Sequence, residues 1–528
     1  MKLRLLVPIM AVVAVSLAAC TSSGSASPKG SGASTTHASG HANVNVRIGG
    51  DWPTLDPYQT SGNLNTDILD SGIFDRLVAL GPDGKTVVPY LATKWDVTPT
   101  KLVFTIRSGV TCSDGTPMDA AAIAGSLKYL ITQSEAPQEL GGGPYKITND
   151  ASTVTIELGK PYSDALYKLS DAHASIICPA GITMMKAKNS TQTVGSGPYT
   201  IAEAVHSDHV KLTARPGWKW GPNGETTDGA GRPSSLTVHV VTDESTAANE
   251  LVTGQLDIAS ITGPDVARLI ADKSLRHTTF GGQYLSNLVF NPSNIALQDQ
   301  QVRKAISQAI DTKAFMQADT GGYGVTSASP FAPGATCYDP SVASLVSPPS
   351  VNTAKATLQA DGYTISGGKA TKGGKQLSFT MVTTTQNFSA AGQEYIASTL
   401  GEVGIDVKIK SVDASTYNQL LVAGNYDLAQ QLLSGGGPAP GDYMLYMTGP
   451  SFKDGGGNTS INDPAVNSLV QAAFSSTPDT QCAAWDAVQK TVIKNNDVLP
   501  LDQQQKQYFA KGIKMITFTL LHLDTLTR

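Results

Sequence analysis

Apolar residues in the body of the chain recur at the two spacings that regular secondary structure requires. Residues 102–107 (LVFTIR) alternate apolar and polar positions, which predicts a strand with one buried face. From 302 to 310 the spacing changes to three and four residues, and Asp299 precedes this stretch as a helix N-cap. We expect the apolar stripe of this helix (Val302, Ala305, Ile306, Ala309 and Ile310) to pack into the core and not to form a site.

A strand, a helix and a second strand are predicted in this order between 377 and 409. Alternating apolar residues mark the first strand at 377–381, and a helix is predicted over 390–403. Gly404 stops this helix before a second alternating strand at 405–409. Two strands joined through a helix normally lie parallel in one sheet, so the predicted fold class is α/β.

The chain begins with a segment that resembles a lipoprotein signal peptide. Lys2 and Arg4 precede about eleven mostly apolar residues, a run shorter than the roughly twenty that cross a bilayer. The sequence LAAC at 17–20 resembles the bacterial lipobox, in which the cysteine receives lipid and becomes the first residue after cleavage. We therefore expect residues 1–19 to be a signal peptide and Cys20 to anchor an extracytoplasmic protein to the cell membrane. The alternative is an ordinary signal peptide with an incidental cysteine.

Composition divides the remaining chain into a linker and a folded body. Residues 20–43 are mostly Ser, Gly, Ala and Thr, which predicts a lipidated cysteine followed by a flexible linker. With 528 residues, 40% of them apolar, the chain is too long for one hydrophobic core, so two or more lobes are expected. Without residues 1–19 the chain has 36 basic and 43 acidic side chains and a net charge of −7. This charge, and the lack of a basic stripe, argue against nucleic acid as a partner.

Four cysteines remain once Cys20 is assigned to lipid: Cys112, Cys178, Cys337 and Cys482. Disulfides persist in exported proteins, and four cysteines allow three pairings. No two of them stand at C-x-x-C spacing, so a zinc site is not expected. Free buried thiols are the alternative to two disulfides.

The motifs of common enzymes are missing or incomplete. The sequence has no G-x-S-x-G, H-E-x-x-H or Walker A motif, and the phosphate-loop-like stretch 362–369 has an extra Gly and continues with Ala370 where Ser or Thr is required. His206, Asp208 and His209 would suit a metal on one helical turn, but their place between strand-like segments favours a solvated turn. We expect no enzyme activity, no metal and no cofactor.

A series of short motifs runs along the chain in a fixed order. They are Leu55-Asp56-Pro57, Ile73-Phe74-Asp75-Arg76-Leu77, Pro89-Tyr90-Leu91-Ala92, Trp95, Phe104-Thr105-Ile106-Arg107-Ser108-Gly109-Val110, Ser113-Asp114-Gly115-Thr116-Pro117, Gly195-Ser196-Gly197-Pro198-Tyr199, Asn291-Pro292, Val302-Arg303-Lys304-Ala305 and Ala309-Ile310-Asp311. In this order they resemble the extracytoplasmic solute-binding proteins of family 5, the dipeptide, oligopeptide and nickel receptors of ABC importers. The resemblance runs from about 44 to 500, and its specificity lies in the ordered series.

The resemblance implies a two-lobed clamshell of the periplasmic-binding-protein type II class (cluster C) with an extra subdomain in lobe I. The expected divisions are lobe I at 44–284, its inserted subdomain at about 82–190, lobe II at 285–491 and a return to lobe I at 492–528. Larger family members carry a lobe II disulfide at a separation similar to that between Cys337 and Cys482, which favours this pair. Cys112 with Cys178 is then favoured because each bond stays within one lobe.

The resemblance also suggests two stretches of the ligand-binding wall. In peptide-binding relatives an aspartate after a strand of the Tyr-Asp-Leu-Ala type pairs with the α-ammonium of the ligand. Alignment without gaps places Gly436 there, so the usual ammonium clamp is missing, and a small shift would bring in Asp442. The expected ligand-binding residues are Thr60, Ser61, Gly62 and Asn63 in lobe I and Leu433, Ser434, Gly435, Gly436 and Asp442 in lobe II. Plain turns are the alternative for both stretches.

The function implied by the resemblance is that of a receptor for an ABC importer. The protein would act as a monomer that captures a peptide-like or other small polar solute between its lobes and presents it to the permease subunits. A receptor for a nickel chelate or other non-peptide cargo is the first alternative. A surface signalling or structural lipoprotein that is not coupled to import is the second.

Overall fold

The computed structural model describes most of the chain beyond residue 42. The described residues are 43–59, 63–134, 136–280, 285–384, 388–433, 438–444, 447–451, 457, 459–460, 463–515, 517 and 521–528. The predicted signal peptide, Cys20 and nearly all of the predicted linker lie outside them. The chain from residue 41 onward forms one compact unit. Within the described residues, no helix has the length and apolar character needed to cross a bilayer.

A seven-stranded sheet forms the centre of lobe I. Its strands lie in the order β12-β22-β11-β1-β10-β9-β8, and β1 runs parallel to both β10 and β11. The bounds are β1 (Asn43–Ile48), β8 (Tyr199–Val205), β9 (His209–Ala214), β10 (Ser235–Val240), β11 (Ile258–Ile261), β12 (Leu275–Phe280) and β22 (Lys506–Lys511). Val44, Val46 and Ile48 alternate along β1 and are buried, so one face of this strand packs against the core.

An inserted antiparallel sheet and several helices complete lobe I. The sheet has the order β4-β5-β7-β6, with β4 (Ala92–Thr98), β5 (Lys101–Ile106), β6 (Tyr145–Asn149) and β7 (Thr153–Leu158). The other elements are α1 (Leu64–Ile73), β2 (Val78–Leu80), β3 (Val87–Pro89), α2 (Ala120–Leu130), α3 (Ala136–Leu140), α4 (Ala165–Lys168), α5 (Pro179–Lys186), α6 (Glu244–Thr253) and α7 (Asp265–Ala271). The strand predicted at 102–107 is β5, and its Leu102 and Phe104 are buried as the alternation requires.

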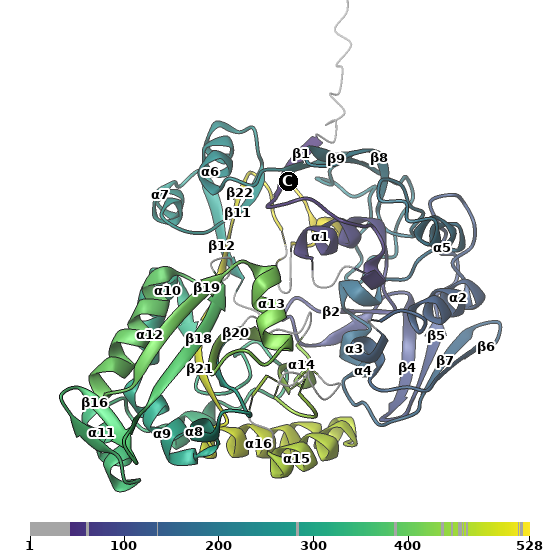
Figure 1. The fold of residues 1–528 in the computed structure, drawn as a ribbon. Helices are drawn as coiled ribbons and strands as arrows, with labels where there is room; N and C mark the ends of the chain where they lie inside the picture. Colours follow the sequence, from purple (N-terminus) through teal and green to yellow (C-terminus); the bar gives the residue numbers. More distant parts are fainter. Residues whose placement is uncertain are drawn as a thin grey trace, which may run out of the picture. The chain divides into compact units, whose positions relative to one another are not determined.

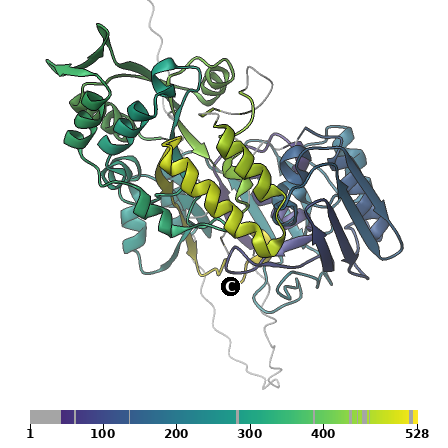
Figure 2. The ribbon, with the colours of Figure 1, turned by 90° about the horizontal axis from the view of Figure 1, so that it is seen from below.

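A six-stranded sheet forms the centre of lobe II, in the order β14-β21-β13-β20-β18-β19. Its strands are β13 (Leu285–Phe290), β14 (Gly324–Thr326), β18 (Ser378–Thr384), β19 (Asp406–Val412), β20 (Leu428–Leu433) and β21 (Val498–Gln504). The helices are α8 (Ile295–Gln298), α9 (Gln300–Ala309), α10 (Thr312–Thr320), α11 (Val351–Ala360), α12 (Ala390–Val403), α13 (Ala414–Val422), α14 (Gly441–Met444), α15 (Pro464–Phe474) and α16 (Pro478–Lys494). Figure 1 shows α10 and α12 along this sheet, and Figure 2 shows α15 beside α16.

The helices and strands with the strongest sequence patterns lie where they were predicted. α12 spans Ala390–Val403 and ends at Gly404, which adopts a left-handed φ of +97°. β18 and β19 are parallel, with Phe379 opposite Val407, as the predicted strand–helix–strand order requires. The side chain of Asp299 caps α9 through the backbone N–H of Gln301. These predictions are confirmed.

The chain passes between the two sheets after β12 and again after β21. β21 still pairs with β13, with Val289 opposite Val498 and Leu288 opposite Leu499. The next strand, β22, pairs with β11 and β12 of the first sheet, and Gln505 separates β21 from β22. The chain therefore returns to the first sheet at about 505 instead of the expected 492, because α16 and β21 belong to lobe II.

Both favoured disulfides are present. Cys112 is bonded to Cys178 across 66 residues of lobe I, and Cys337 is bonded to Cys482 on α16 across 145 residues. The alternative of free buried thiols is therefore wrong. Each bond links segments of one lobe, so neither prevents the two lobes from moving relative to each other.

Replacing Cys337 and Cys482 together by Ser is expected to lower the free energy of unfolding by about 2–5 kcal/mol, because this bond restricts the unfolded chain. Urea unfolding followed by circular dichroism measures the change. The matched control replaces Cys112 and Cys178, which close a shorter loop and should give a slightly smaller loss. Unfolding of the Cys337/Cys482 variant at the native urea midpoint would contradict the prediction.

Candidate functional site

A cavity of about 630 Å³ lies between the lobes beside the segment that crosses from β21 to β22. Its walls come from the turn after β11 in lobe I, from the ends of α10 and α12 in lobe II, and from the crossing segment itself. The lining residues are 262–264, Val266, Ala267, 319–321, Tyr323, Phe388, Ser389, Gln504, Gln505 and Gln507. A solute held here contacts both lobes, which makes the cavity the candidate ligand site.

The ends of regular elements place these side chains at the cavity. Gly263 has a φ of +71°, which lets the chain turn from β11 into α7. Gly321 has a φ of +63° and ends α10 as a left-handed C-cap, shortly before Tyr323. Ser389 begins α12 as its N-cap and accepts a hydrogen bond from the backbone N–H of Gly392. These caps and turns bring the chain ends of α7, α10 and α12 to the cavity.

Asp319 is the one carboxylate among the lining residues that the structure describes. It accepts hydrogen bonds from the Ser389 backbone N (2.9 Å), from the Ser389 hydroxyl (3.1 Å) and from Gln504 Nε2 (3.2 Å). Burial raises the pKa of Asp319, and the hydrogen bonds from Ser389 and Gln504 offset part of this rise. Glutamine amides and hydroxyl groups supply the rest of the polar wall, and no Lys or Arg is among the described lining residues.

A second buried carboxyl, Asp502, lies in β21 shortly before the crossing segment. Asp502 is fully buried and lies opposite Ser286 of β13. Burial, and then the charge of Asp319, raise the pKa of Asp502 to about 8, while the neighbouring Ser286 lowers it in part. At neutral pH Asp502 is therefore mostly protonated, and the two neighbouring carboxyls carry less negative charge than their sequence suggests.

Stability is expected to fall as the pH rises from about 5 to about 8, because native Asp502 keeps a proton that the unfolded chain releases near pH 4. A carboxyl whose folded pKa is raised contributes fully below its unfolded pKa and loses this contribution up to its folded pKa, here about 8. One such group gives a slope approaching about 1.4 kcal/mol per pH unit. Asp502→Asn keeps the shape without the titration, so thermal melts across this range should show a shallower slope. An unchanged slope would refute the assignment.

Asp442, one of the predicted ligand-binding residues, is buried in a contact between the lobes. Its carboxylate lies 3.3 Å from the Nζ of Lys168 in α4, and Glu139 and Asp171 lie 3.5 Å and 3.6 Å from the same ammonium. Burial lowers the pKa of Lys168, but Asp442, Glu139 and Asp171 together raise it well above its usual value. Lys168 is therefore charged, and it already pairs with Asp442.

The other predicted ligand-binding residues fall into two groups. Asn63 is the N-cap of α1, where its Oδ1 accepts hydrogen bonds from the backbone N of Asn65 (3.0 Å) and of Thr66 (3.3 Å). Leu433 ends β20 and is buried in the core of lobe II. The others (Thr60, Ser61, Gly62, Ser434, Gly435 and Gly436) lie outside the described residues. A role of these residues in ligand binding stays a prediction.

The residues that line the cavity were not among those predicted from the sequence. They come from four segments far apart in the chain, and no motif connects them. One local signal was available at 503–507 (QQQKQ), where five polar residues interrupt two strand-forming stretches. Gln503 and Gln507 are nonetheless buried. Buried polar residues inside strands often mark a functional position, so this run could have directed attention to the crossing segment.

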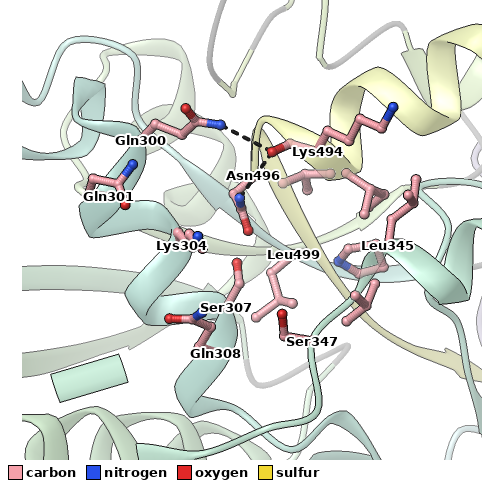
Figure 3. A pocket seen from close by; sticks show the side chains of 14 residues that line it. Gln300, Gln301, Lys304, Ser307, Gln308, Leu345, Ser347, Lys494, Asn496 and Leu499 are labelled. Atoms are coloured by element: carbon pink, nitrogen blue, oxygen red, sulfur yellow. Dashed lines mark hydrogen bonds between the residues drawn. The ribbon is translucent and has the colours of Figure 1, made fainter. Parts of the chain in front are cut away.

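A second pocket, of about 340 Å³, lies on lobe II alone (Figure 3). Side chains of α9, including Gln300 and Lys304, face the loop at 345–347 and the end of α16. Gln300 Nε2 donates a hydrogen bond to the carbonyl oxygen of Lys494 (3.1 Å). Every lining residue belongs to lobe II, so a solute bound here would not connect the lobes. This pocket therefore serves as a control for the cavity between them.

His206 and His209 flank the turn that joins β8 to β9, in agreement with the predicted solvated turn. Ser207 in this turn has a φ of +61°. His206 Nδ1 lies 3.2 Å from Asp51, and His209 Nδ1 lies 3.0 Å from Asp208. Among the described residues, no three His, Cys, Asp or Glu side chains gather in a way that could hold a metal ion.

Comparison with known proteins covers both lobes. Residues 86–455 match the family model of the bacterial extracellular solute-binding proteins, family 5 Middle. The chain is 25% identical over 482 residues to the probable D,D-dipeptide-binding periplasmic protein DdpA of Escherichia coli K12, covering 88% of this chain and 89% of that protein. A substrate binding protein from Microbacterium hydrocarbonoxydans, solved with 4-hydroxybenzoate hydrazide, is 26% identical, with a TM-score of 0.72 over 92% of this chain and 99% of that one. A dipeptide binding protein from Pseudoalteromonas sp. SM9913, solved with Met-Leu, is 18% identical, with a TM-score of 0.73 over 92% and 100%. These similarities confirm the predicted α/β periplasmic-binding-protein fold.

Proposed function

The chain belongs to the bacterial extracellular solute-binding proteins of family 5, and from this premise we propose that it captures a small polar solute in the cavity between its lobes for an ABC importer. A protein of this family is a receptor and not an enzyme, so the cavity has to bind and release its solute without changing it. The position of the cavity carries the proposal, because its walls come from both lobes and from the segment that joins them.

Binding between two lobes converts occupancy into a change of shape. A solute favours the closed arrangement only by the difference between its affinities for the closed and open states. Contacts with lobe I at 262–264 and with lobe II at 319–321 supply this difference when the lobes come together. Permease subunits that recognise the closed arrangement then receive loaded receptors in preference to empty ones.

The described wall of the cavity suits a peptide-like or other hydrogen-bonding solute. The amides of Gln504, Gln505 and Gln507 both donate and accept hydrogen bonds, and Tyr323 and Phe388 offer aromatic surface. The name of the E. coli relative gives D,D-dipeptides as its ligand. The similar protein from M. hydrocarbonoxydans was solved with a hydrazide.

A non-peptide cargo is the second candidate. Alignment without gaps places Gly436 where peptide-binding relatives carry the aspartate that pairs with the α-ammonium. The nearby Asp442 pairs with Lys168 instead. Neither position therefore offers a free carboxylate to a peptide N-terminus, which favours a cargo other than a free peptide.

Tyr323→Ala is expected to weaken retention of the solute by about tenfold or more, because an aromatic side chain in a ligand cavity supplies a large share of the contact energy. Native mass spectrometry of the body from residue 44 onward, purified without refolding, identifies the bound mass, and titration measures its affinity. Gln301→Ala in the lobe II pocket is the matched control and should bind as the native protein does. Loss of the solute from Gln301→Ala, with retention by Tyr323→Ala, would place binding in the other pocket.

The lipid anchor completes the proposed function. A receptor that serves a membrane importer gains from remaining at the membrane surface, and the LAAC sequence at 17–20 supplies the signal. Several acyl chains on one cysteine hold a protein firmly, at about 0.8 kcal/mol for each buried CH₂ group. Residues 20–43 would then act as the tether between the lipid and the folded body.

Cys20→Ser is expected to shift the protein from the membrane fraction to the soluble fraction, because serine cannot receive the thioether-linked lipid. Fractionation of cells that produce the full chain, followed by immunoblotting, measures the shift. Ser22→Ala, just beyond the lipobox, is the control and should remain with the membranes. A Cys20→Ser protein as membrane-bound as the native one would refute the anchor.

A further inference from the structure

One buried ammonium joins the two lobes away from the ligand cavity. Lys168 of α4 lies 3.5 Å from Glu139 and 3.6 Å from Asp171, both in lobe I, and 3.3 Å from Asp442 of α14 in lobe II. All four side chains are at most 4% exposed. These residues are called the Lys168 cluster below. Asp442 is its one member that belongs to lobe II.

Direct hydrogen bonds between the lobes surround this cluster. Asp164 of lobe I accepts a hydrogen bond from the backbone N of Gly441 (2.7 Å) and another from Gln481 Nε2 (2.7 Å). The backbone N of Ser163 donates to the carbonyl oxygen of Phe474 (3.0 Å). The cluster thus lies inside a continuous contact between α4 in lobe I and α14, α15 and α16 in lobe II.

Asp442 stabilises the buried charges of lobe I only while the two lobes are in contact, because it is the carboxylate that lobe II supplies to Lys168. A neighbouring imidazole, His173, lies 3.3 Å from Asp67 and 3.6 Å from Asp171. Burial lowers the pKa of His173, but Asp67 and Asp171 raise it to about 10, so His173 adds a second positive charge to lobe I. Removing Asp442 from this buried site would take a carboxylate away from two nearby cations, while Glu139 and Asp171 stay in place.

We propose that Lys168 and Asp442 form a latch that stabilises the joined arrangement of the lobes, so that part of the free energy of closure does not depend on a charged group of the cargo. Both residues are positioning residues, because neither lines the ligand cavity. The latch itself needs no assumption about the cargo. The consequence for cargo, that an uncharged hydrogen-bonding solute suffices, rests on the proposed function. It agrees with the amide-rich wall of the cavity.

Asp442→Asn is the variant that tests the latch, because it keeps the shape of the side chain and leaves the lobe I part of the cluster intact. The amides of Ser163 and Gly441 report on the contact, since each donates a hydrogen bond to the other lobe. In ligand-free Asp442→Asn protein, peptides that contain these amides should exchange hydrogen about tenfold faster or more. The radius of gyration from small-angle X-ray scattering should increase at the same time.

Glu139→Gln is the matched control. It removes a carboxyl group from the same ammonium at a similar distance, but within lobe I. Because burial raises the pKa of Glu139 to about 7, both variants are compared at pH 8, where this carboxyl is mostly ionised. This variant should keep the native exchange rates at Ser163 and Gly441 and the native radius of gyration. Native exchange rates in Asp442→Asn would overturn the proposal. Equal opening of both variants would also overturn it, because the effect would then come from a general loss of buried charge.

The experiment separates the latch from the proposed function. Samples are checked by native mass spectrometry to carry no solute, so the result does not depend on which cargo the receptor takes. If Asp442→Asn opens the lobes but no cargo is ever found, the latch stands and the proposed function fails. If a cargo binds in the cavity but Asp442→Asn stays closed, the proposed function stands and the latch fails.

Discussion

The extended segment at 498–511 hydrogen-bonds first in one sheet and then in the other, and the arrangement of the receptor depends on it. β21 pairs with β13 in lobe II, and β22 pairs with β11 and β12 in lobe I. A strand that leaves one sheet and enters another fixes the ends of both lobes close together. The ligand cavity lies beside this crossing, and Gln504, Gln505 and Gln507 from the same segment form part of its wall. The connection between the lobes is therefore also part of the candidate ligand site.

Local sequence patterns were sufficient for elements that one stretch of chain determines. α12 was predicted to the residue because its helical pattern is strong and Gly404 ends it in a conformation that favours glycine. The return to lobe I was placed too early, at 492 instead of about 505. A strand continues to look like a strand when it changes sheets, and the polar run at 503–507 does not by itself show which sheet each flanking strand joins.

The candidate site was less accessible to sequence reasoning, because tertiary structure creates it. Its walls combine turns near 263 and 321 with residues near 388 and 505. Asp442 was selected for its distance from a strand, and its pairing with Lys168, which is 274 residues away in the sequence, could not be inferred from that distance. The disulfides were predictable for a different reason: export restricts the chemistry of cysteine, and the family resemblance then limited the pairing.

The place of β22 in its sheet has a consequence for the order in which lobe I folds. This strand lies between β11 and β12 and is built from residues 506–511, close to the C-terminus. The sheet of lobe I cannot be completed until the chain has been synthesised beyond residue 511. A chain that lacks these residues leaves the edges of β11 and β12 without their shared partner, so it stays incompletely folded.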